Sequence, residues 1–142
     1  MEKINSLTGM TDLIETKADE NVLANKVFQT EKILKEIFTN YAMSEIRTPA
    51  LENTNLFKRS VGDTSDIVNK ELYTFSDKND KSITLRPEGT ASVMRSIIEK
   101  KLDGETHKLW YLGPMWRYER PQKGRYRQFN QAGIEILGYP EG

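Results

Sequence analysis

The chain has 142 residues, 37% of them hydrophobic and 30% charged, a balance typical of a folded domain rather than of a disordered segment. Lys and Arg together number 21, as do Asp and Glu, so net charge gives no reason to expect non-specific nucleic-acid binding. Cysteine is absent and histidine occurs once, which excludes disulfides and thiolate metal sites and argues against a zinc site. No apolar run has the length of a membrane-spanning helix or the form of a signal peptide, so we expect a cytoplasmic protein.

The first part of the chain predicts one long helix. Residues 1–18 show no sustained periodicity, and Gly9 with Thr11-Asp12 suggests a turn. Over residues 19–41 apolar side chains recur at helical spacing and predict an amphipathic helix with one broad buried face. That face would contain Leu23, Val27, Leu34, Phe38 and Tyr41, flanked by Ile33 and Ile37.

Shorter elements are predicted next. Residues 44–48 read as a short strand that Pro49 stops, because proline has no amide to donate to a ladder. A short helix over 53–60 and a turn at 61–63 follow. The β-prone segments 72–75 and 82–85, joined by the polar residues 76–81, predict a hairpin. After Arg86-Pro87 a second helix is predicted and Gly104 closes it. Its spacing comes from Ala91, Met94, Ile98 and Leu102.

The last third predicts two antiparallel strands. Residues 108–118 are rich in aromatics, and Gly113-Pro114 within them argues for a bulge or a sheet edge. Residues 128–137 can be the partner strand, and the loop between, 120–127, is polar and cationic. We find no repeat and no linker, so residues 1–142 are expected to form one α+β unit.

Basic residues gather locally even though the whole chain is neutral. Between His107 and Gln128 six basic residues stand against the single acid Glu119. Such a patch can attract phosphate groups. The six are Lys108, Arg117, Arg120, Lys123, Arg125 and Arg127.

The segment RPEGT, residues 86–90, lies between a predicted strand and a predicted helix. Its Glu88 could bind an ammonium or imidazole group of a small ligand, and Thr90 places a hydroxyl in the first helical turn. The competing interpretation is that Glu88 and Thr90 only cap the helix, since acids and hydroxyls are favoured at helix N-termini. From these residues alone capping is slightly favoured.

A second segment, GPMWRYERPQKGRYRQFNQAGIE at 113–135, collects further polar chemistry. Arg117 and Glu119 are one residue apart, so on a strand both side chains would point to one face. An arginine fork matches phosphate oxygens, an aromatic ring can stack on a base, and a glutamate can pair with an ammonium group. Period-two spacing places on one face of the partner strand Phe129, Gln131, Gly133 and Glu135. Gly133 would leave that surface open to a ligand. Cross-strand ion pairs on a surface sheet offer an equally good account.

Residues 113–135 resemble motif 2 of class II aminoacyl-tRNA synthetases, and RPEGT with GRYRQF resembles the histidyl-tRNA synthetase family in particular. The similarity covers almost the whole chain, since EIRTPALE with the preceding helix resembles motif 1, and GMTD resembles the family's opening turn. LFKRSVGDTSDIV and LYTFSD resemble the connecting segments. Motif 1 would span about 19–50 and motif 2 about 108–138. The resemblance implies a class II catalytic-core fold, α+β, with an antiparallel sheet flanked by helices.

The resemblance also implies roles for single residues. Arg117 would be catalytic, holding the ATP α-phosphate and stabilising transition-state charge. Glu119 would contact the adenine amino group and Phe129 would stack on the ring. ATP would be bound by Arg117, Glu119, Arg125 and Phe129. Histidine would be bound by Glu88, Gly89, Thr90, Arg117, Gln131 and Glu135. The tRNA acceptor end would meet Arg120, Gln122 and Lys123. No residue would bind a metal directly, and Mg²⁺ would come with the triphosphate.

The activity implied is that of a histidine–tRNA ligase, with histidine, ATP and tRNA(His) as substrates and a homodimer formed through motif 1. The chain stops soon after motif 2, before motif 3, the second histidine-specific segment and the anticodon-binding domain. We therefore expect weak activation of histidine at best, and no efficient aminoacylation, from these 142 residues alone.

Two alternatives remain open. The first is a non-catalytic, synthetase-like regulatory subunit of ATP phosphoribosyltransferase, in histidine biosynthesis. The full set Arg117, Glu119, Gln131 and Glu135 favours the enzyme over that subunit. The second is an interaction module that associates through the helix at 19–41 and the strand at 44–48. The apolar face of this helix could equally pack within the chain's own core.

Overall fold

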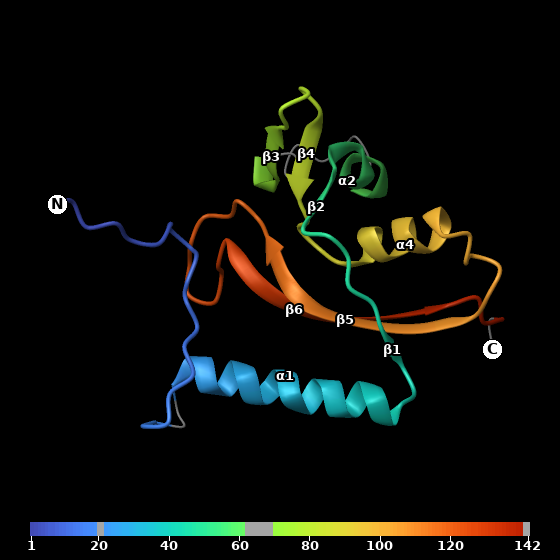
Figure 1. Ribbon diagram of the computed structural model, residues 1–142, viewed down its shortest axis with the longest axis horizontal. Coiled ribbons are helices and arrows are strands. Elements are labelled where there is room, and N and C mark those ends of the chain that lie inside the picture. The colour runs from blue at the N-terminus through green and yellow to red at the C-terminus, as the bar shows by residue number, and fades with distance from the viewer. Residues whose placement is uncertain (20–21, 62–69, 141–142) are drawn as a thin grey trace.

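The structure is a computed structural model that describes residues 1–19, 22–61 and 70–140. It contains two three-stranded sheets with the strand orders β1-β5-β6 and β2-β4-β3. Figure 1 shows the β5–β6 hairpin between two layers: α1 runs along one face, and α4 with the smaller sheet and α2 lies on the other. The α+β prediction is thus confirmed. None of the described helices is long and apolar enough to cross a membrane.

The larger sheet is built on a long hairpin. Strands β5 (His107–Trp116) and β6 (Gln128–Leu137) pair antiparallel over their full lengths, with Tyr111 opposite Gly133. The short strand β1 (Ser44–Glu45) pairs parallel with β5. It ends earlier than the predicted 44–48 because Thr48 is turned towards Arg86, whose guanidinium binds both its carbonyl and its hydroxyl oxygen.

Pro114 sits in β5 without a bulge. The Trp116 amide donates to the Arg86 carbonyl at 3.0 Å, away from β6. Amide directions alternate along a strand, so the amide that Pro114 lacks would also have pointed away from β6. Its pairing with Asn130 is therefore undisturbed, and β1 has already ended at this point. The edge position predicted for this dipeptide is confirmed, and the bulge is wrong.

The smaller sheet confirms the predicted hairpin. Strands β3 (Tyr73–Ser76) and β4 (Ser82–Leu85) pair antiparallel, and the Asp77 carboxylate accepts the amides of Asn79 and Lys81 in the turn. The third strand, β2 (Leu51–Asn53), was not predicted, because three residues carry no measurable periodicity. It leads directly into α2 (Thr54–Val61). Of the turn predicted at 61–63, residues 62 and 63 lie outside the described residues.

Helix α1 (Leu23–Asn40) begins later than the predicted residue 19. The Asn25 side-chain amide donates to the carbonyls of Thr16 and Asp19, and its oxygen accepts the Thr16 amide, so the preceding chain folds back over the first turn. On the sheet side Phe38 stacks on Trp110 with ring centroids 5.1 Å apart. The helix itself buries Ala24, Asn25 and Phe38.

The broad buried face predicted for this helix is wrong within the described part of the chain. Leu23 and Ile33 are each 56% exposed, Ile37 is 43% exposed and Tyr41 is 69% exposed. The sheet is narrow, and it covers only one side of the helix (Figure 1). A second apolar stripe of α1 therefore remains in contact with solvent.

Helix α4 (Thr90–Glu99) packs on the opposite face of the hairpin. Its Val93 and Ile97 form the buried core with Leu109 of β5. The predicted end at Gly104 is wrong: the helix ends at Glu99, and Lys101 adopts the left-handed conformation (φ 56°) that turns the chain out of it. Sequence alone favours glycine for that position, and a lysine occupies it here.

Arg86 joins the two sheets. It is 9% exposed, and its backbone donates to the Ala50 carbonyl and accepts the Trp116 amide. Its guanidinium donates to the Thr48 carbonyl at 2.7 Å and to the Pro114 carbonyl at 3.0 Å. Burial lowers the pKa of Arg86, while the nearby negative charge of Glu52 acts in the opposite direction. Arg86, directly after β4, thus bonds to the link between β1 and β2 and to the C-terminal part of β5.

We expect Arg86→Lys to destabilise the fold. An ammonium group cannot reach the Thr48 and Pro114 oxygens together, so at least one buried carbonyl loses its partner, at a cost of about 1–3 kcal/mol. Urea unfolding followed by circular dichroism measures the change. Arg47→Lys, at an exposed arginine paired with Glu45, is the matched control and should leave the midpoint unchanged. Equal midpoints for the two variants would contradict the role given to Arg86.

Candidate active site

The face of β6 that lies towards α4 carries the polar residues predicted to share it. Along β6 partly buried and exposed residues alternate without interruption, which confirms that the four residues lie on one face. They are Phe129, Gln131, Gly133 and Glu135. The opposite face carries the exposed Ile134 and Ile136, 48% and 54% accessible.

Glu88 caps α4. Its carboxylate accepts the backbone amides of Thr90 at 2.5 Å and Ala91 at 3.0 Å. The capping interpretation is therefore what the structure shows for Glu88, as expected for an acid beside the positive end of a helix. A carboxylate can accept about four hydrogen bonds, so these two contacts leave Glu88 capacity for a ligand.

Thr90 does not cap the helix. Its hydroxyl donates to the Glu135 carboxylate at 2.7 Å, and the Gly89 amide donates to the Gln131 side-chain oxygen at 2.9 Å. Two hydrogen bonds thus tie the start of α4 to the middle of β6. Residues far apart in sequence become one cluster of carboxylate, amide and hydroxyl groups.

Arg117 lies just beyond the end of β5. Its Nε donates to the Pro87 carbonyl at 3.0 Å, and its guanidinium carbon is 5.2 Å from the centre of the Phe129 ring. Among the described residues nothing binds its two terminal nitrogens. The guanidinium is therefore oriented by RPEGT and by an aromatic ring, while the ends of its fork remain available.

Glu119 does not share a strand face with Arg117, and that prediction is wrong. The strand ends at Trp116, and the Glu119 amide donates to the Arg117 carbonyl at 2.8 Å. Such a bond closes a tight three-residue turn, so period-two spacing no longer applies. Arg127, where the chain comes back after the following loop, packs against this turn. Its guanidinium carbon lies 4.0 Å from the centre of the Tyr118 ring, and its Nε donates to the Glu119 carbonyl.

The loop from 120 to 127 forms a small exposed hairpin of its own. The Arg125 amide donates to the Gln122 carbonyl at 2.9 Å around Gly124, whose φ is +81°. The Arg127 and Gln128 amides both donate to the Gly9 carbonyl, so the N-terminal turn anchors the returning end of the loop. The predicted loop residues Arg120, Gln122, Lys123 and Arg125 are all exposed, and no contact joins them to the Thr90–Glu135 pair in the described part.

Tyr111 is the residue of this site that sequence reasoning missed. Its ring lies between two glycines: a Cβ on Gly133 would come within 2.2 Å of the Tyr111 Cζ atom, and one on Gly89 within 2.4 Å. The expectation that Gly133 leaves the surface open to a ligand is therefore wrong, because this ring fills the space. The cross-strand pairing of an aromatic residue with a glycine was the available signal, since aromatic rings can cover a glycine on the neighbouring strand.

The electrostatics around Tyr111 follow from this position. Burial raises the pKa of Tyr111, and the negative charges of Glu135 and Glu88 raise it further, against a hydrogen bond with Thr90 that lowers it. Since the phenol starts from about 10, it stays protonated at neutral pH. It can therefore act as a hydrogen-bond donor inside the cluster.

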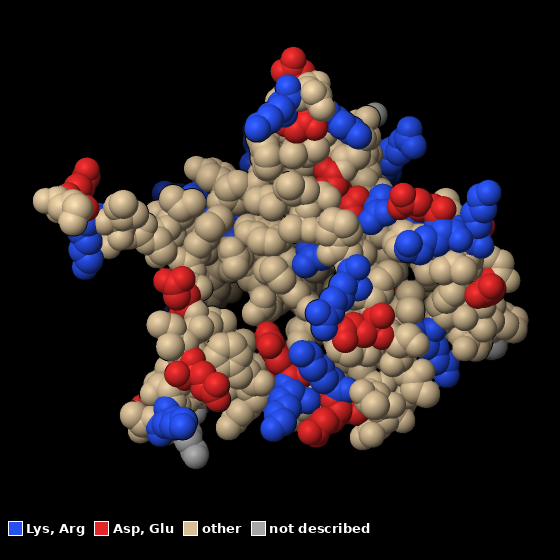
Figure 2. All heavy atoms as spheres, viewed as in Figure 1, with Lys and Arg blue, Asp and Glu red and all other residues tan. Residues whose placement is uncertain are grey.

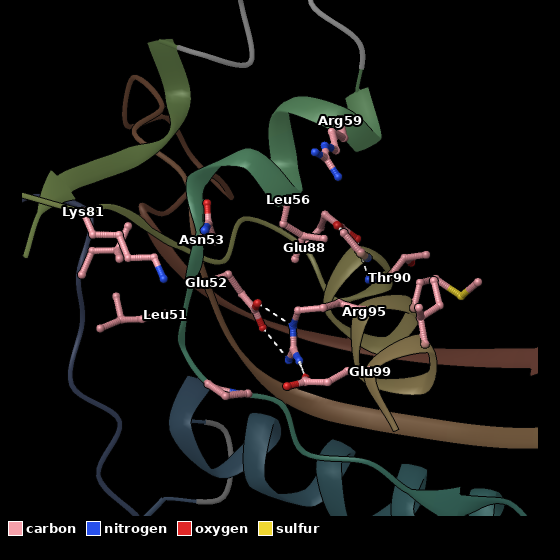
Figure 3. Close-up of a pocket in the computed structure, with 15 residues that line it drawn as sticks. Leu51, Glu52, Asn53, Leu56, Arg59, Lys81, Glu88, Thr90, Arg95 and Glu99 are labelled. Carbon is pink, nitrogen blue, oxygen red and sulfur yellow. Dashed lines mark hydrogen bonds and ion pairs between the residues drawn. The ribbon is translucent and has the colours of Figure 1, made fainter. Parts of the chain in front are cut away.

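A cleft of about 1140 Å³ lies on the other side of α4, between this helix, α2 and the smaller sheet (Figure 3). Glu52 in it is 6% exposed and pairs with Arg95 through two contacts of 2.7 and 2.8 Å, and Arg95 also binds Glu99 at 2.6 Å. Glu88 and Thr90 reach the rim of this cleft, but Arg117, Gln131 and Glu135 do not line it. The charges of Glu52, Arg95 and Glu99 are paired with one another. We therefore place the candidate site on the β6 face.

Surface charge adds little to the placement of the site. Figure 2 shows basic and acidic side chains interspersed over the visible face. This distribution agrees with the equal numbers of basic and acidic residues in the chain. The candidate site is accordingly defined by its specific contacts.

The chain was compared with known proteins. The family model described as "Histidyl-tRNA synthetase" matches residues 20–141. A histidine–tRNA ligase of Desulfitobacterium hafniense is 61% identical over 110 residues, which are 76% of this chain and 26% of that protein. The crystal structure of apo histidyl-tRNA synthetase from S. aureus is similar with a TM-score of 0.74 and 42% identity, covering 96% of this chain and 30% of the other.

A further solved structure is more distant. A protein from Bacillus halodurans, described as an ATP phosphoribosyltransferase regulatory subunit/histidyl-tRNA synthetase, has a TM-score of 0.68 and 23% identity. It covers 99% of this chain and 35% of that protein. At this identity the likeness shows the fold alone. The chain spans between a quarter and about a third of the length of each of these relatives.

We expect Gly133→Ala to destabilise the fold, because its Cβ would overlap the Tyr111 ring. Overpacking of this kind costs about 1–3 kcal/mol. Gly104→Ala is a matched control, since a Cβ there would meet nothing within 4 Å, and it should leave stability equal or slightly raised. Thermal and urea unfolding measure both. The same stability in the two variants would contradict the packing of Tyr111 against Gly133.

Proposed function

Since the chain belongs to the histidyl-tRNA synthetase family, we propose that it supplies part of the site where histidine reacts with ATP to give histidyl-adenylate and pyrophosphate. The histidyl group would then pass to tRNA(His). The observation that carries this proposal is Arg117, oriented by the Pro87 carbonyl and the Phe129 ring with its terminal nitrogens unbound among the described residues. Arg117 lies just beyond the end of β5, beside the face of β6 that carries Phe129, Gln131 and Glu135.

Arg117 is proposed as the catalytic residue. The histidine carboxylate would attack the α-phosphorus, and negative charge would grow on the non-bridging oxygens as pyrophosphate leaves. A guanidinium fork matches two such oxygens, and charge stabilisation of this type often lowers the barrier more than any other single effect in an active site. Because Nε is already held by Pro87, the fork loses little freedom when it binds.

Further residues are proposed to hold the nucleotide. Adenine would stack on Phe129, beside Arg117, and its amino group would donate to Glu119. Arg125, on the exposed loop, would approach the triphosphate. Mg²⁺ would be carried by the phosphate oxygens, because it is usually bound through substrate phosphates and few carboxylates.

The histidine pocket is proposed on the cluster between α4 and β6. Its residues would be Glu88, Gly89, Thr90, Gln131 and Glu135, together with Arg117. One Glu135 oxygen accepts the Thr90 hydroxyl, and the other can accept an N–H from the substrate. A pocket whose polar groups are pre-arranged rejects ligands that would leave them unpaired. Such a pocket suits a substrate with both an ammonium group and an imidazole.

The exposed loop is proposed to contact tRNA. Arg120, Gln122 and Lys123 carry charge or amide groups at its surface and would bind phosphates of the acceptor end. Contacts of this type position a nucleic acid without reading its sequence. Because tRNA charging serves translation, we propose that the protein acts in the cytoplasm.

A regulatory subunit of ATP phosphoribosyltransferase is the alternative. Such a protein would bind histidine without forming an adenylate. The relative that carries this description is 23% identical, so it supports only the fold. The unbound ends of the Arg117 fork give the enzyme interpretation its advantage, because binding histidine alone does not require a phosphate ligand.

A homodimer is also proposed, through the uncovered stripe of α1. Ile33, Ile37 and Tyr41 follow one another at four-residue spacing and are 56%, 43% and 69% exposed. A helix side of this kind is stabilised when a second apolar surface covers it. A second copy of the chain would supply that surface.

We expect the 142-residue chain to bind ATP·Mg²⁺ and histidine, each measurable by isothermal titration calorimetry. Arg117→Ala should weaken ATP binding about tenfold or more, because it removes a charge-assisted contact of about 1.5–3 kcal/mol. Arg47→Ala, at an exposed arginine outside the site, is the control and should change nothing. Unchanged ATP affinity in Arg117→Ala would contradict the role of Arg117. Histidine-dependent ATP–pyrophosphate exchange should be far slower than that of a full-length relative.

We expect light scattering to give the mass of a dimer at high protein concentration. The double variant Ile33→Glu with Ile37→Glu should be a monomer, because it places two charges on the apolar stripe of α1. Lys32→Glu, on the same helix but with no apolar side chain lost, should remain a dimer. A monomeric unmodified chain would contradict the proposed interface.

A further inference from the structure

We propose that Arg127 is a positioning residue that sets the selectivity for adenine by holding Glu119 in place. The inference rests on the proposed function, in which Glu119 accepts a hydrogen bond from the adenine amino group, and it deepens that function. Arg127 is not among the residues proposed above to bind histidine, ATP or tRNA. It nevertheless contacts the turn 117–119 through both its backbone and its side chain.

The side chain of Arg127 contacts the last two residues of this turn. Its Nε donates to the Glu119 carbonyl at 3.0 Å, and its guanidinium carbon lies 4.0 Å from the centre of the Tyr118 ring. A guanidinium this close to an aromatic ring is attracted to the π face. Tyr118 is held in turn, because its amide donates to the Glu71 carbonyl at 2.6 Å and its ring meets Tyr73 edge-on. The turn is thus anchored at Arg127 and at the start of β3.

The backbone of Arg127 is fixed by two other segments. Its carbonyl accepts the Arg117 amide at 2.9 Å, and its own amide donates to the Gly9 carbonyl at 2.8 Å. Gly9 has a φ of +76°, and a Cβ there would lie 2.8 Å from the Arg127 Cγ atom. A glycine is therefore needed for the N-terminal turn to come this close to the base of the Arg127 side chain.

These contacts fix the backbone of Glu119 and leave its carboxylate available. Within residues 1–19, 22–61 and 70–140, no hydrogen bond or ion pair involves that carboxylate. A carboxylate on a fixed backbone loses less freedom when it binds a ligand than one on a mobile loop.

A carboxylate held in this way can distinguish the two purines. Adenine carries an amino group at the position where guanine carries a carbonyl oxygen. Ionised Glu119 accepts a hydrogen bond from the amino group and repels the carbonyl oxygen. The selectivity for ATP over GTP therefore reports how well Glu119 is positioned, whereas contacts to the triphosphate affect both nucleotides alike.

The test compares ATP·Mg²⁺ with GTP·Mg²⁺ in the variant Arg127→Met, which keeps an unbranched stem and removes the guanidinium. We expect the selectivity, the ratio of the GTP to the ATP dissociation constant, to fall about tenfold, as for the loss of one hydrogen bond to a charged group. Isothermal titration calorimetry on the same sample measures both constants. Weaker attraction of the triphosphate, or a general loss of structure, would lower both affinities together and leave the ratio unchanged.

Two further arginine variants complete this test. Arg47→Met, at an exposed arginine outside the site, is the matched control and should keep the selectivity of the unmodified chain. Arg127→Lys keeps the charge but lacks the planar fork, so it should lose selectivity as Arg127→Met does. Normal selectivity in Arg127→Met would overturn the inference. Selectivity restored by lysine would overturn it too, because the charge alone would then suffice.

The contribution of the N-terminal turn is tested by Gly9→Ala. The added Cβ would displace the Arg127 side chain, so we expect this variant to lose selectivity as well. In an Arg127→Met background the same change should cause no further loss of selectivity, because residues that act through one contact are not additive. Full selectivity in Gly9→Ala, or a second tenfold loss in the double variant, would contradict a path through Arg127.

The proposed function and this inference fail in different ways. If the unmodified chain does not bind ATP, the proposed function fails and the inference falls with it. If Glu119→Ala keeps the selectivity of the unmodified chain, the adenine contact proposed for Glu119 fails. If Glu119→Ala loses selectivity and Arg127→Met keeps it, the function stands and only the positioning role of Arg127 is lost.

Discussion

The buried guanidinium of Arg86 is the contact on which the rest of the structure depends. It donates to carbonyls on both sides, Thr48 and Pro114, and its own backbone bonds to the chain before β2 and to the end of β5. Gly113 makes room for it, since a Cβ there would lie 2.9 Å from an Arg86 nitrogen. Burying the charge carries a desolvation cost, which several hydrogen bonds to it offset. The following residues of RPEGT are positioned by this anchor.

The candidate site follows from that anchor in a short series of contacts. Pro87 orients Arg117, Glu88 caps α4, and Gly89 and Thr90 bond to β6. Each residue of RPEGT thus has a structural contact, and for Glu88 that contact is the helix cap. The same contacts place the groups proposed to bind histidine, so the structural and the functional interpretations of this segment are compatible. Tyr111 completes the series by filling the space between α4 and β6.

Much of this was available from sequence. Period-two and helical spacing predicted the β5–β6 and β3–β4 hairpins and the helices, because local periodicity reports which side of an element is buried. The shared face of Phe129, Gln131 and Glu135 followed from the same rule. Membership of the family was visible in the motifs and is shown by the match over residues 20–141. The residue roles at the site stay proposals.

Other features were decided only by tertiary contacts. Spacing cannot say that β5 ends at Trp116, which separates Glu119 from the face of Arg117, or that Lys101 rather than Gly104 turns the chain out of α4. It also cannot say how much of an apolar helix face a narrow sheet will cover, so α1 was expected to be buried where it is exposed. The filling of the space above Gly133 by Tyr111 depends on strand register and on the distant Gly89. The sequence by itself determined most of the helices and strands and the polar side chains that they carry. Packing between distant segments decided which of those side chains come into contact.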